Sequence, residues 1–270
     1  MINFKKSKQY TLSIRLSADG FCFAVHNPLA DNEFAYMPYR VESHKTVAGN
    51  LKTAMEGTEL LKHSYAAVNI VLPDVQYTIV PKEYYAEQCA SDIYQQNYPQ
   101  AGGSVEVLSN VVGEEQAVVL FAIEKDLYRL ITQRYPKAQI CASISALINY
   151  GVEKSYAQSS PYCLVHLRKQ GTDLLCFSNG TPLFVNTFRG NNMADMQYFL
   201  LNCWQVLGLS QEDDTLHIAG TTRHGKTLMK ELDRFIQNIH QIRPAEEFHS
   251  TELARIDGMP FDLQTLISCE

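Results

Sequence analysis

The residues most suggestive of chemistry are GTTRHGKT, at positions 220–227. They match the phosphate-loop pattern of glycine, any four residues and then Gly-Lys-Thr, between a predicted strand and a predicted helix. In such a loop backbone N–H groups cradle phosphate, Lys226 reaches the outer phosphates and Thr227 holds Mg²⁺. Only 43 residues follow Thr227, too few for the parallel strands that such a fold normally adds. A purely structural strand-to-helix turn therefore remains as an alternative.

Other patterns for chemistry are weaker. The eight histidines show no HxxxH or HxH spacing, and the sequence has no GxSxG element, so we predict neither a metal site nor a catalytic triad. None of the seven cysteines forms a CxxC pair, and several lie in apolar runs. We interpret them as buried thiols in a reducing compartment.

Composition narrows the class of protein. The chain has 270 residues, of which 46% are hydrophobic, with a formal charge of −6. This balance is typical of a globular protein and gives no basic field for a nucleic acid or an anionic membrane. The longest clean apolar run, residues 117–123, is far shorter than the roughly 20 residues of a membrane span. We expect a cytoplasmic protein with no transmembrane segment and no nucleic-acid partner.

The order of predicted elements repeats. Residues 10–41 predict three strands, the first two joined by an Asp-Gly turn, followed by a helix from Val47 and the strand AAVNIVLP. The second half offers a hairpin from Cys163, a third strand TPLFVNTF, a helix ending at Gly208 and the strand TLHIAG. Helices are also expected at 82–98, 125–135, 144–154 and 226–239. The similar spacing of the two halves predicts a duplicated unit, with a first lobe at 1–156 and a second at 157–270.

This order resembles the actin, sugar-kinase and chaperone ATPase superfamily. ICASISALINYG is similar to the element that ends the first lobe of bacterial pilus-assembly and cell-division actin homologues, and IAGTTRHGKTLMKEL resembles the superfamily's adenosine motif. The whole order also resembles an uncharacterised bacterial family, a domain of unknown function with an actin-like ATPase fold. The resemblance implies an α/β, two-lobed, ribonuclease H-like fold with mixed sheets and a duplicated strand-strand-strand-helix-strand-helix unit.

In that superfamily a nucleotide lies between the lobes, held by two hairpin turns and a third loop. The resemblance implies ATP or ADP as ligand, with Mg²⁺ only if nucleotide is bound. The positions that it implicates are Ser17, Asp19 and Gly20 in the first turn, Arg168, Gly171 and Thr172 in the second, and Gly220, Thr221, Thr222, Gly225 and Lys226 in the third loop.

The metal-organising carboxylates of the superfamily have no counterpart. Alignment of the hairpins puts Arg15 and His166 there, and neither supplies the oxygen ligands that Mg²⁺ prefers. Asp19 and Asp173 lie close by and could substitute if the register slips, or they could simply form turns. The first hypothesis is a non-catalytic adaptor or scaffold, a pseudoenzyme that could retain a nucleotide. The alternatives are an active ATPase or phosphotransferase and a phosphate-loop NTPase through 220–227.

The sequence also bears on partners. The resemblance implies a protein partner or a homo-oligomer. Four tyrosines, Tyr84, Tyr85, Tyr94 and Tyr98, could form an exposed aromatic surface for a partner or pack half-buried around a helix.

Overall fold

The computed structural model describes residues 2–101, 103–190, 192–220, 225–248, 252–256 and 258–269. Contacts divide the chain into two compact units. The first comprises the chain up to Ala146 together with the described residues of 250–268, and the second begins at Leu147 and ends before them. The lobes at 1–156 and 157–270 stay a prediction. In the contact units the C-terminal segment groups with the first unit, where the C-terminal helix contacts the first strand and Asp262 pairs with Arg15.

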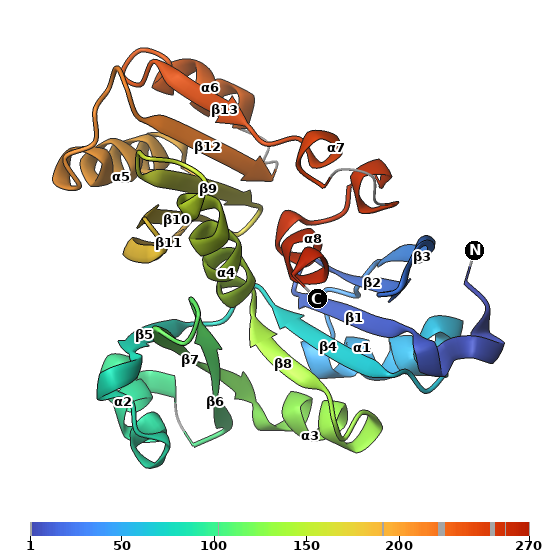
Figure 1. Ribbon diagram of the computed structural model, residues 1–270. Helices are drawn as coiled ribbons and strands as arrows, with labels where there is room; N and C mark the ends of the chain where they lie inside the picture. The colour runs from blue at the N-terminus through green and yellow to red at the C-terminus, as the bar shows by residue number, and fades with distance from the viewer. Residues whose placement is uncertain are drawn as a thin grey trace. The chain divides into compact units, whose positions relative to one another are not determined.

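The first unit is built on a five-stranded mixed sheet of order β3-β2-β1-β4-β8. Its strands are β1 (Thr11–Ser17), β2 (Gly20–Asn27), β3 (Ala30–Tyr39), β4 (Ala67–Leu72) and β8 (Gln139–Ala142). The strand pairs β1–β2 and β2–β3 are antiparallel, whereas β4 runs parallel to both β1 and β8. Helices α1 (Val47–Gly57) and α3 (Lys125–Arg134) contact each other beside this sheet (Figure 1).

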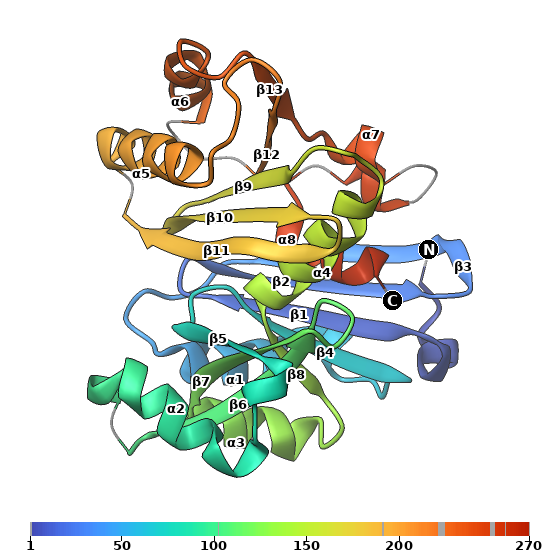
Figure 2. The same ribbon diagram turned by 60° about the vertical axis from the view of Figure 1, so that its left-hand side comes forward.

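A second, three-stranded sheet is inserted between β4 and α3. It has the order β5-β7-β6, with β5 (Tyr77–Pro81), β6 (Val105–Val112) and β7 (Ala117–Glu124). Helix α2 (Ala90–Asn97) covers one face, where buried Tyr94 packs against Val118 and Leu120 (Figure 2). The helix predicted at 82–98 was too long: short 3-10 turns, η3 (Lys82–Tyr84) and η4 (Glu87–Cys89), precede α2. Strand β5 was not predicted.

The second unit repeats the first sheet. Its five strands, β9 (Tyr162–Arg168), β10 (Gly171–Ser178), β11 (Thr181–Arg189), β12 (Thr215–Gly220) and β13 (Asn238–Gln241), have the order β11-β10-β9-β12-β13. Helix α5 (Met193–Val206) joins β11 to β12, and α6 (Gly225–Leu232) precedes β13. Position by position this is the order of the first sheet, which supports the predicted duplication. The helix predicted at 226–239 was too long: α6 ends at Leu232, and Asn238 and Ile239 belong to β13, which pairs in parallel with β12.

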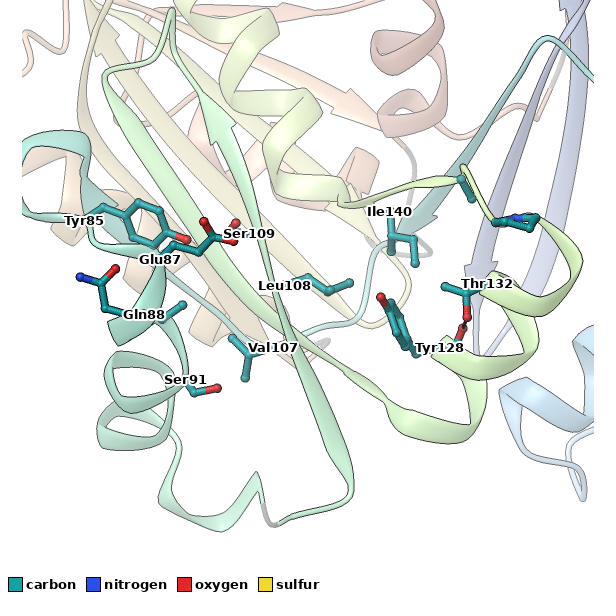
Figure 3. Close-up of a pocket in the computed structure, with 13 residues that line it drawn as sticks. Tyr85, Glu87, Gln88, Ser91, Val107, Leu108, Ser109, Tyr128, Thr132 and Ile140 are labelled. Carbon is teal, nitrogen blue, oxygen red and sulfur yellow. Dashed lines mark hydrogen bonds between the residues drawn. The ribbon is translucent and has the colours of Figure 1, made fainter.

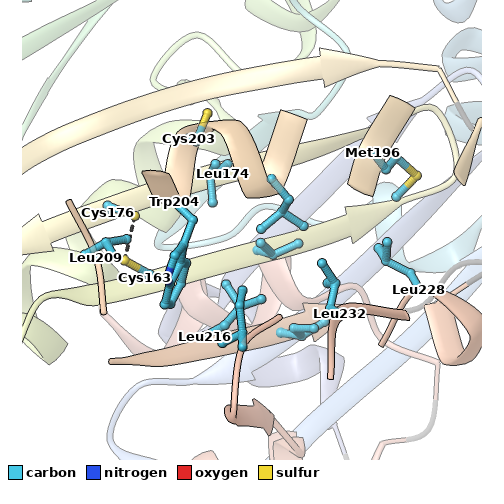
Figure 4. Packing of buried hydrophobic residues seen from close by; sticks show 14 of the residues in the cluster. Cys163, Leu174, Cys176, Met196, Cys203, Trp204, Leu209, Leu216, Leu228 and Leu232 are labelled. Carbon is cyan, nitrogen blue, oxygen red and sulfur yellow. Dashed lines mark hydrogen bonds between the residues drawn. The ribbon is translucent and has the colours of Figure 1, made fainter. Parts of the chain in front are cut away.

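The core of the second unit lies between α5, α6 and its sheet (Figure 4). Trp204 from α5 packs there with Leu216 of β12 and Leu232 of α6. Cys163 and Cys176 face each other across β9 and β10, with their sulfurs 2.7 Å apart. All seven cysteines are free thiols, but Cys89 and Cys269 are exposed, contrary to the prediction that all are buried.

The remaining elements connect these parts. Helix α4 (Ser143–Tyr156) leads into the second unit, and α8 (Phe261–Ser268) contacts β1 in the first. Short turns complete the chain: η1 (Phe4–Gln9), η2 (Glu59–Leu61), η5 (Pro99–Ala101), α7 (Pro244–Glu247) and η6 (Glu252–Arg255). Among the described residues, no helix has the length and apolar character to cross a membrane.

Candidate functional site

The two hairpins place Arg15 and His166 at equivalent positions. Each hairpin closes on a pair, Ser17↔Gly20 in β1–β2 and Arg168↔Gly171 in β9–β10. Counting back along the first strand from either closing pair reaches Arg15 or His166. The register therefore agrees with the alignment made from sequence, and no slip brings Asp19 or Asp173 to this position.

Arg15 is neutralised from a distant part of the chain. Its Nε lies 2.9 Å from Oδ1 and 3.0 Å from Oδ2 of Asp262, the second residue of α8. The Asp262 side chain is fully buried and that of Arg15 is 12% exposed. The Asp262 carboxylate is thus buried near the end of β1, and the Arg15 guanidinium binds both of its oxygens. Breaking such a pair from one side costs about 3–5 kcal/mol, so its first role is structural.

Asp173 in β10 is enclosed by donors. His166 Nδ1 lies 3.0 Å from Oδ2, and Arg168 binds both oxygens, with Nε and Nη2 each at 2.8 Å. Thr187 Oγ1 donates to Oδ1 at 2.7 Å. Because an ionised carboxylate only accepts hydrogen bonds, His166 Nδ1 carries a proton. These four hydrogen bonds occupy the lone pairs of both oxygens and leave none for a metal ion.

The electrostatics of Asp173 agree with this geometry. Burial acts to raise its pKa, but the hydrogen bond from His166 and the charge and hydrogen bonds of Arg168 outweigh burial and hold the pKa well below its usual range. Asp173 is thus a permanently ionised structural carboxylate. Arg168 is one of the residues that the resemblance implicates in phosphate binding. In this structure its guanidinium binds Asp173.

The first turn carries a small polar cluster. Ser17 Oγ donates to Asp74 Oδ2 at 2.7 Å and lies 3.4 Å from Asp19 Oδ1. Asp74 follows β4, so both carboxylates lie where the parallel strands β1 and β4 end. Sequence reasoning missed Asp74, although a Pro-Asp pair directly after a continuous apolar strand was a usable signal. Across the described residues, no three His, Cys, Asp or Glu side chains gather to hold a metal ion.

Close backbone packing explains why glycine stands at 171 in the second hairpin turn and at 220 at the start of the third loop. A Cβ on Gly220, which has a φ of 76°, would lie 2.4 Å from the Leu167 carbonyl oxygen, and one on Gly171 would lie 2.8 Å from that of Phe188. Both glycines are therefore required where backbones approach closely, whether or not a phosphate binds. Thr172 is buried, and the described residues offer its Oγ1 no partner.

The phosphate-loop pattern is described only at its ends. Gly220 ends β12, Gly225 begins α6 and is buried, and Lys226 is exposed in the first turn of α6. Thr221 and Thr222 lie outside the described residues. The strand and helix that flank the pattern are both present. Thr227, the residue that would hold Mg²⁺, is an exposed residue of the same first turn.

The residues present do not fit a magnesium site of the superfamily type. Arg15 and His166 occupy the two positions that the resemblance assigns to the metal-organising carboxylates, and the nearest buried carboxylates, Asp262 and Asp173, are each bound by an arginine. Mg²⁺ requires oxygen ligands in near-octahedral geometry.

A groove in the first unit was not predicted from sequence. It has a volume of about 470 Å³ and runs along β6, with η4 and α2 on one side and α3 and β8 on the other (Figure 3). Tyr85 and Tyr128 lie at its two sides, and Leu108 lies between them. Of the four tyrosines singled out in the sequence, Tyr94 is buried, Tyr98 packs on it, Tyr84 is 73% exposed and Tyr85 lines this groove.

Comparison with known proteins places the chain in a family. Residues 1–239 match the model of the family described as protein of unknown function (DUF3822). The chain belongs to this family. A crystal structure from Bacteroides thetaiotaomicron VPI-5482, described as a protein with actin-like ATPase fold and unknown function, is 34% identical to this DUF3822 chain, covers 100% of both chains and has a TM-score of 0.88.

A more distant structure shares the fold of the DUF3822 chain. It belongs to the PilM-PilN type IV pilus biogenesis complex, with 11% identity, a TM-score of 0.57 and coverage of 95% of this chain and 96% of that one. No curated protein matches the chain. The predicted actin-like ATPase fold with mixed sheets is therefore confirmed, as is the predicted family resemblance.

Proposed function

We propose that this DUF3822 protein is a non-catalytic member of the actin-like fold that acts as an adaptor or scaffold for another protein. The observation that carries the proposal is the pair of equivalent positions at Arg15 and His166. Phosphoryl transfer depends on metal ions that neutralise the charge spreading over the transferred group. A site with basic side chains at both metal-organising positions lacks the groups for that task.

A protein ligand is consistent with the comparisons. The PilM structure that shares this fold is part of a complex with PilN. Seven free thiols, two of them facing each other at 2.7 Å between sulfurs, favour a reducing compartment and so a cytoplasmic protein. A nucleotide retained as a structural ligand would be compatible with the adaptor role.

One observation supports a second candidate, an NTPase that uses residues 220–227. The pattern lies between β12 and α6, and Lys226 is exposed at the helix start, where phosphate binds well. The close packing of Gly220 against Leu167 gives its first glycine a structural reason, which weakens this candidate.

A thermal-shift titration with ATP, ADP and GTP, each with and without Mg²⁺, separates these functions. A ligand at 100 times its Kd adds about 2.7 kcal/mol to stability. For an adaptor we expect that any shift of Tm is the same with and without Mg²⁺, because no carboxylate site awaits the metal. A shift that requires Mg²⁺ and is lost in Lys226→Ala would instead establish the phosphate-loop candidate.

A further inference from the structure

The edge strand β6 forms part of the wall of this groove. Strand β6 is last in the order β5-β7-β6, so within the described chain only β7 pairs with it. Val107, Leu108 and Ser109 of β6 all line the groove. Edge strands present unpaired N–H and C=O groups and accept further strands.

The register shows which groups these are. Lys125 N donates to Ser104 O at 2.9 Å, and these two residues are opposite each other in the continuation of the β6–β7 ladder. Hydrogen-bonded pairs alternate along an antiparallel ladder, so the even-numbered residues of β6 bond to β7. The N–H and C=O groups of Val107 and Ser109 therefore point away from β7. The Ser109 C=O already accepts from the Asn110 side-chain amide at 3.2 Å, so the groups offered to a partner are the Val107 N–H and C=O and the Ser109 N–H. Val107 is half-buried and Ser109 is exposed.

The opposite side of the groove already binds one peptide-like group. The side-chain amide of Asn110 donates to Ile140 O at 3.0 Å and accepts from Ala142 N at 3.0 Å. One residue of a strand running parallel to β8 would make the same pair of bonds with its own backbone N–H and C=O, to the O of one residue and the N of the second residue after it. Beyond Asn110 the wall continues with Ile140 and Ala138.

The side chains of the groove favour a segment that carries one basic residue and is otherwise uncharged. Its lining combines apolar groups, such as Val107 and Ile140, with hydroxyl and amide groups, such as Ser91 and Gln88. Glu87, exposed on the η4 side, is the one charged residue among the described residues that line it. A volume of about 470 Å³ lies within the usual range of roughly 300–1,000 Å³ for ligand sites.

We propose that this groove binds an extended segment of a partner protein, which adds a strand to the edge of β6 and places a Lys or Arg near Glu87. Main-chain hydrogen bonds to Val107 and to the Ser109 N–H supply the affinity, and the side chains of the groove walls supply the selectivity. The proposal rests on the adaptor role and identifies the site for it. Failure of the groove leaves the absence of metal chemistry untouched, because Arg15 and His166 lie outside it.

The test uses the full chain and a displayed library of random 12-residue peptides. Peptides selected on the wild-type protein are measured against Ser109→Pro, which removes the outward N–H, and against Ser109→Ala, which keeps it. Proline is tolerated at an edge strand where the N–H has no ladder partner. We expect at least a 10-fold loss of affinity for Ser109→Pro and less than a 2-fold change for Ser109→Ala. Hydrogen exchange of the Val107 and Ser109 amides is expected to slow on peptide binding.

Two further variants keep the test decisive. Ser91→Tyr fills the groove from α2 without altering β6, so it serves if Ser109→Pro fails to fold. Glu87→Lys is expected to weaken the selected peptides that carry Lys or Arg by about 10-fold and to spare uncharged ones. Equal affinity for all variants, unchanged amide exchange or a library that yields no Ser109-dependent peptide would overturn the proposal. So would a wild-type dimer that Ser109→Pro dissociates, since the occupant would then be a second copy.

Discussion

At the residue scale, Arg15 and His166 lie at equivalent positions of the two hairpins, and each pairs with a carboxylate from a different part of the chain. Asp173 lies directly opposite His166 on the neighbouring strand, whereas Asp262 lies 247 residues from Arg15. Alignment of the hairpins identified the two basic positions from sequence. It did not identify their partners, because Asp173 is equally suited to a turn or a metal, and no local pattern links Asp262 to β1.

Replacement of Asp173 tests its structural role. Asp173→Asn leaves His166 and Arg168 without their shared anion, so we expect a loss of about 3–5 kcal/mol in unfolding free energy at pH 7. The pKa of Asp173 is lowered from an ordinary value near 3.8, so its contribution is present above that pH and is lost as pH falls. The difference in unfolding free energy between wild type and variant, measured by urea unfolding, should narrow below about pH 4.

A suitable control for this variant is Asp126→Asn. The Asp126 side chain is 87% exposed and pairs only across a helix turn with Arg129, so its loss should change stability by less than about 0.5 kcal/mol. If Asp173→Asn were as mild as this control, the enclosed carboxylate would not be the structural centre of the second hairpin.

His217 in β12 predicts a second pH effect. Burial lowers its pKa to about 4, although a hydrogen bond to the Cys163 carbonyl opposes the shift. The folded state therefore resists protonation, and stability is lost as pH falls from about 6.5 to about 4. An NMR titration should show the His217 imidazole titrating near pH 4, and His217→Gln should flatten the pH dependence of unfolding. Titration near pH 6.5 would contradict the burial argument.

At the scale of elements, regular patterns were predicted and short polar ones were not. The hairpins β1–β2 and β9–β10 carry glycine at the turn and apolar runs on each strand, and both were found. Ile239 of β13 continues the apolar spacing of α6, so the helix prediction extended to 239. Only the pairing of β13 with β12 makes it a strand. The groove along β6 likewise depends on contacts between separate segments.

The attachment of α8 to β1 can be measured by a double-mutant cycle. Arg15→Met or Asp262→Leu alone leaves a buried charge without its partner, which should cost about 3–5 kcal/mol in urea unfolding. The double variant should cost clearly less than the sum, with a coupling of about 1–3 kcal/mol. Additive losses would show that the two residues do not interact and that this ion pair does not attach α8 to β1.

At the scale of the whole molecule, the chain is a duplicated sheet with one insertion. The orders β3-β2-β1-β4-β8 and β11-β10-β9-β12-β13 correspond strand by strand, and the β5-β7-β6 sheet is an addition to the first copy. The duplication could be predicted because the repeat spacing survives in the sequence. A groove beside the added sheet is a natural place for a partner, because a segment found in one copy can change without disturbing the shared framework.

If this actin-like protein is the non-catalytic adaptor that we propose, it does not turn over nucleotide. The most direct measurement is phosphate release from ATP by the purified chain, with Mg²⁺ and with EDTA in its place. We predict no release above the protein-free blank in either condition, because Arg15 and His166 replace the metal-organising carboxylates. Magnesium-dependent release that Asp19→Asn or Lys226→Ala abolishes would contradict the account and assign an enzyme to this fold.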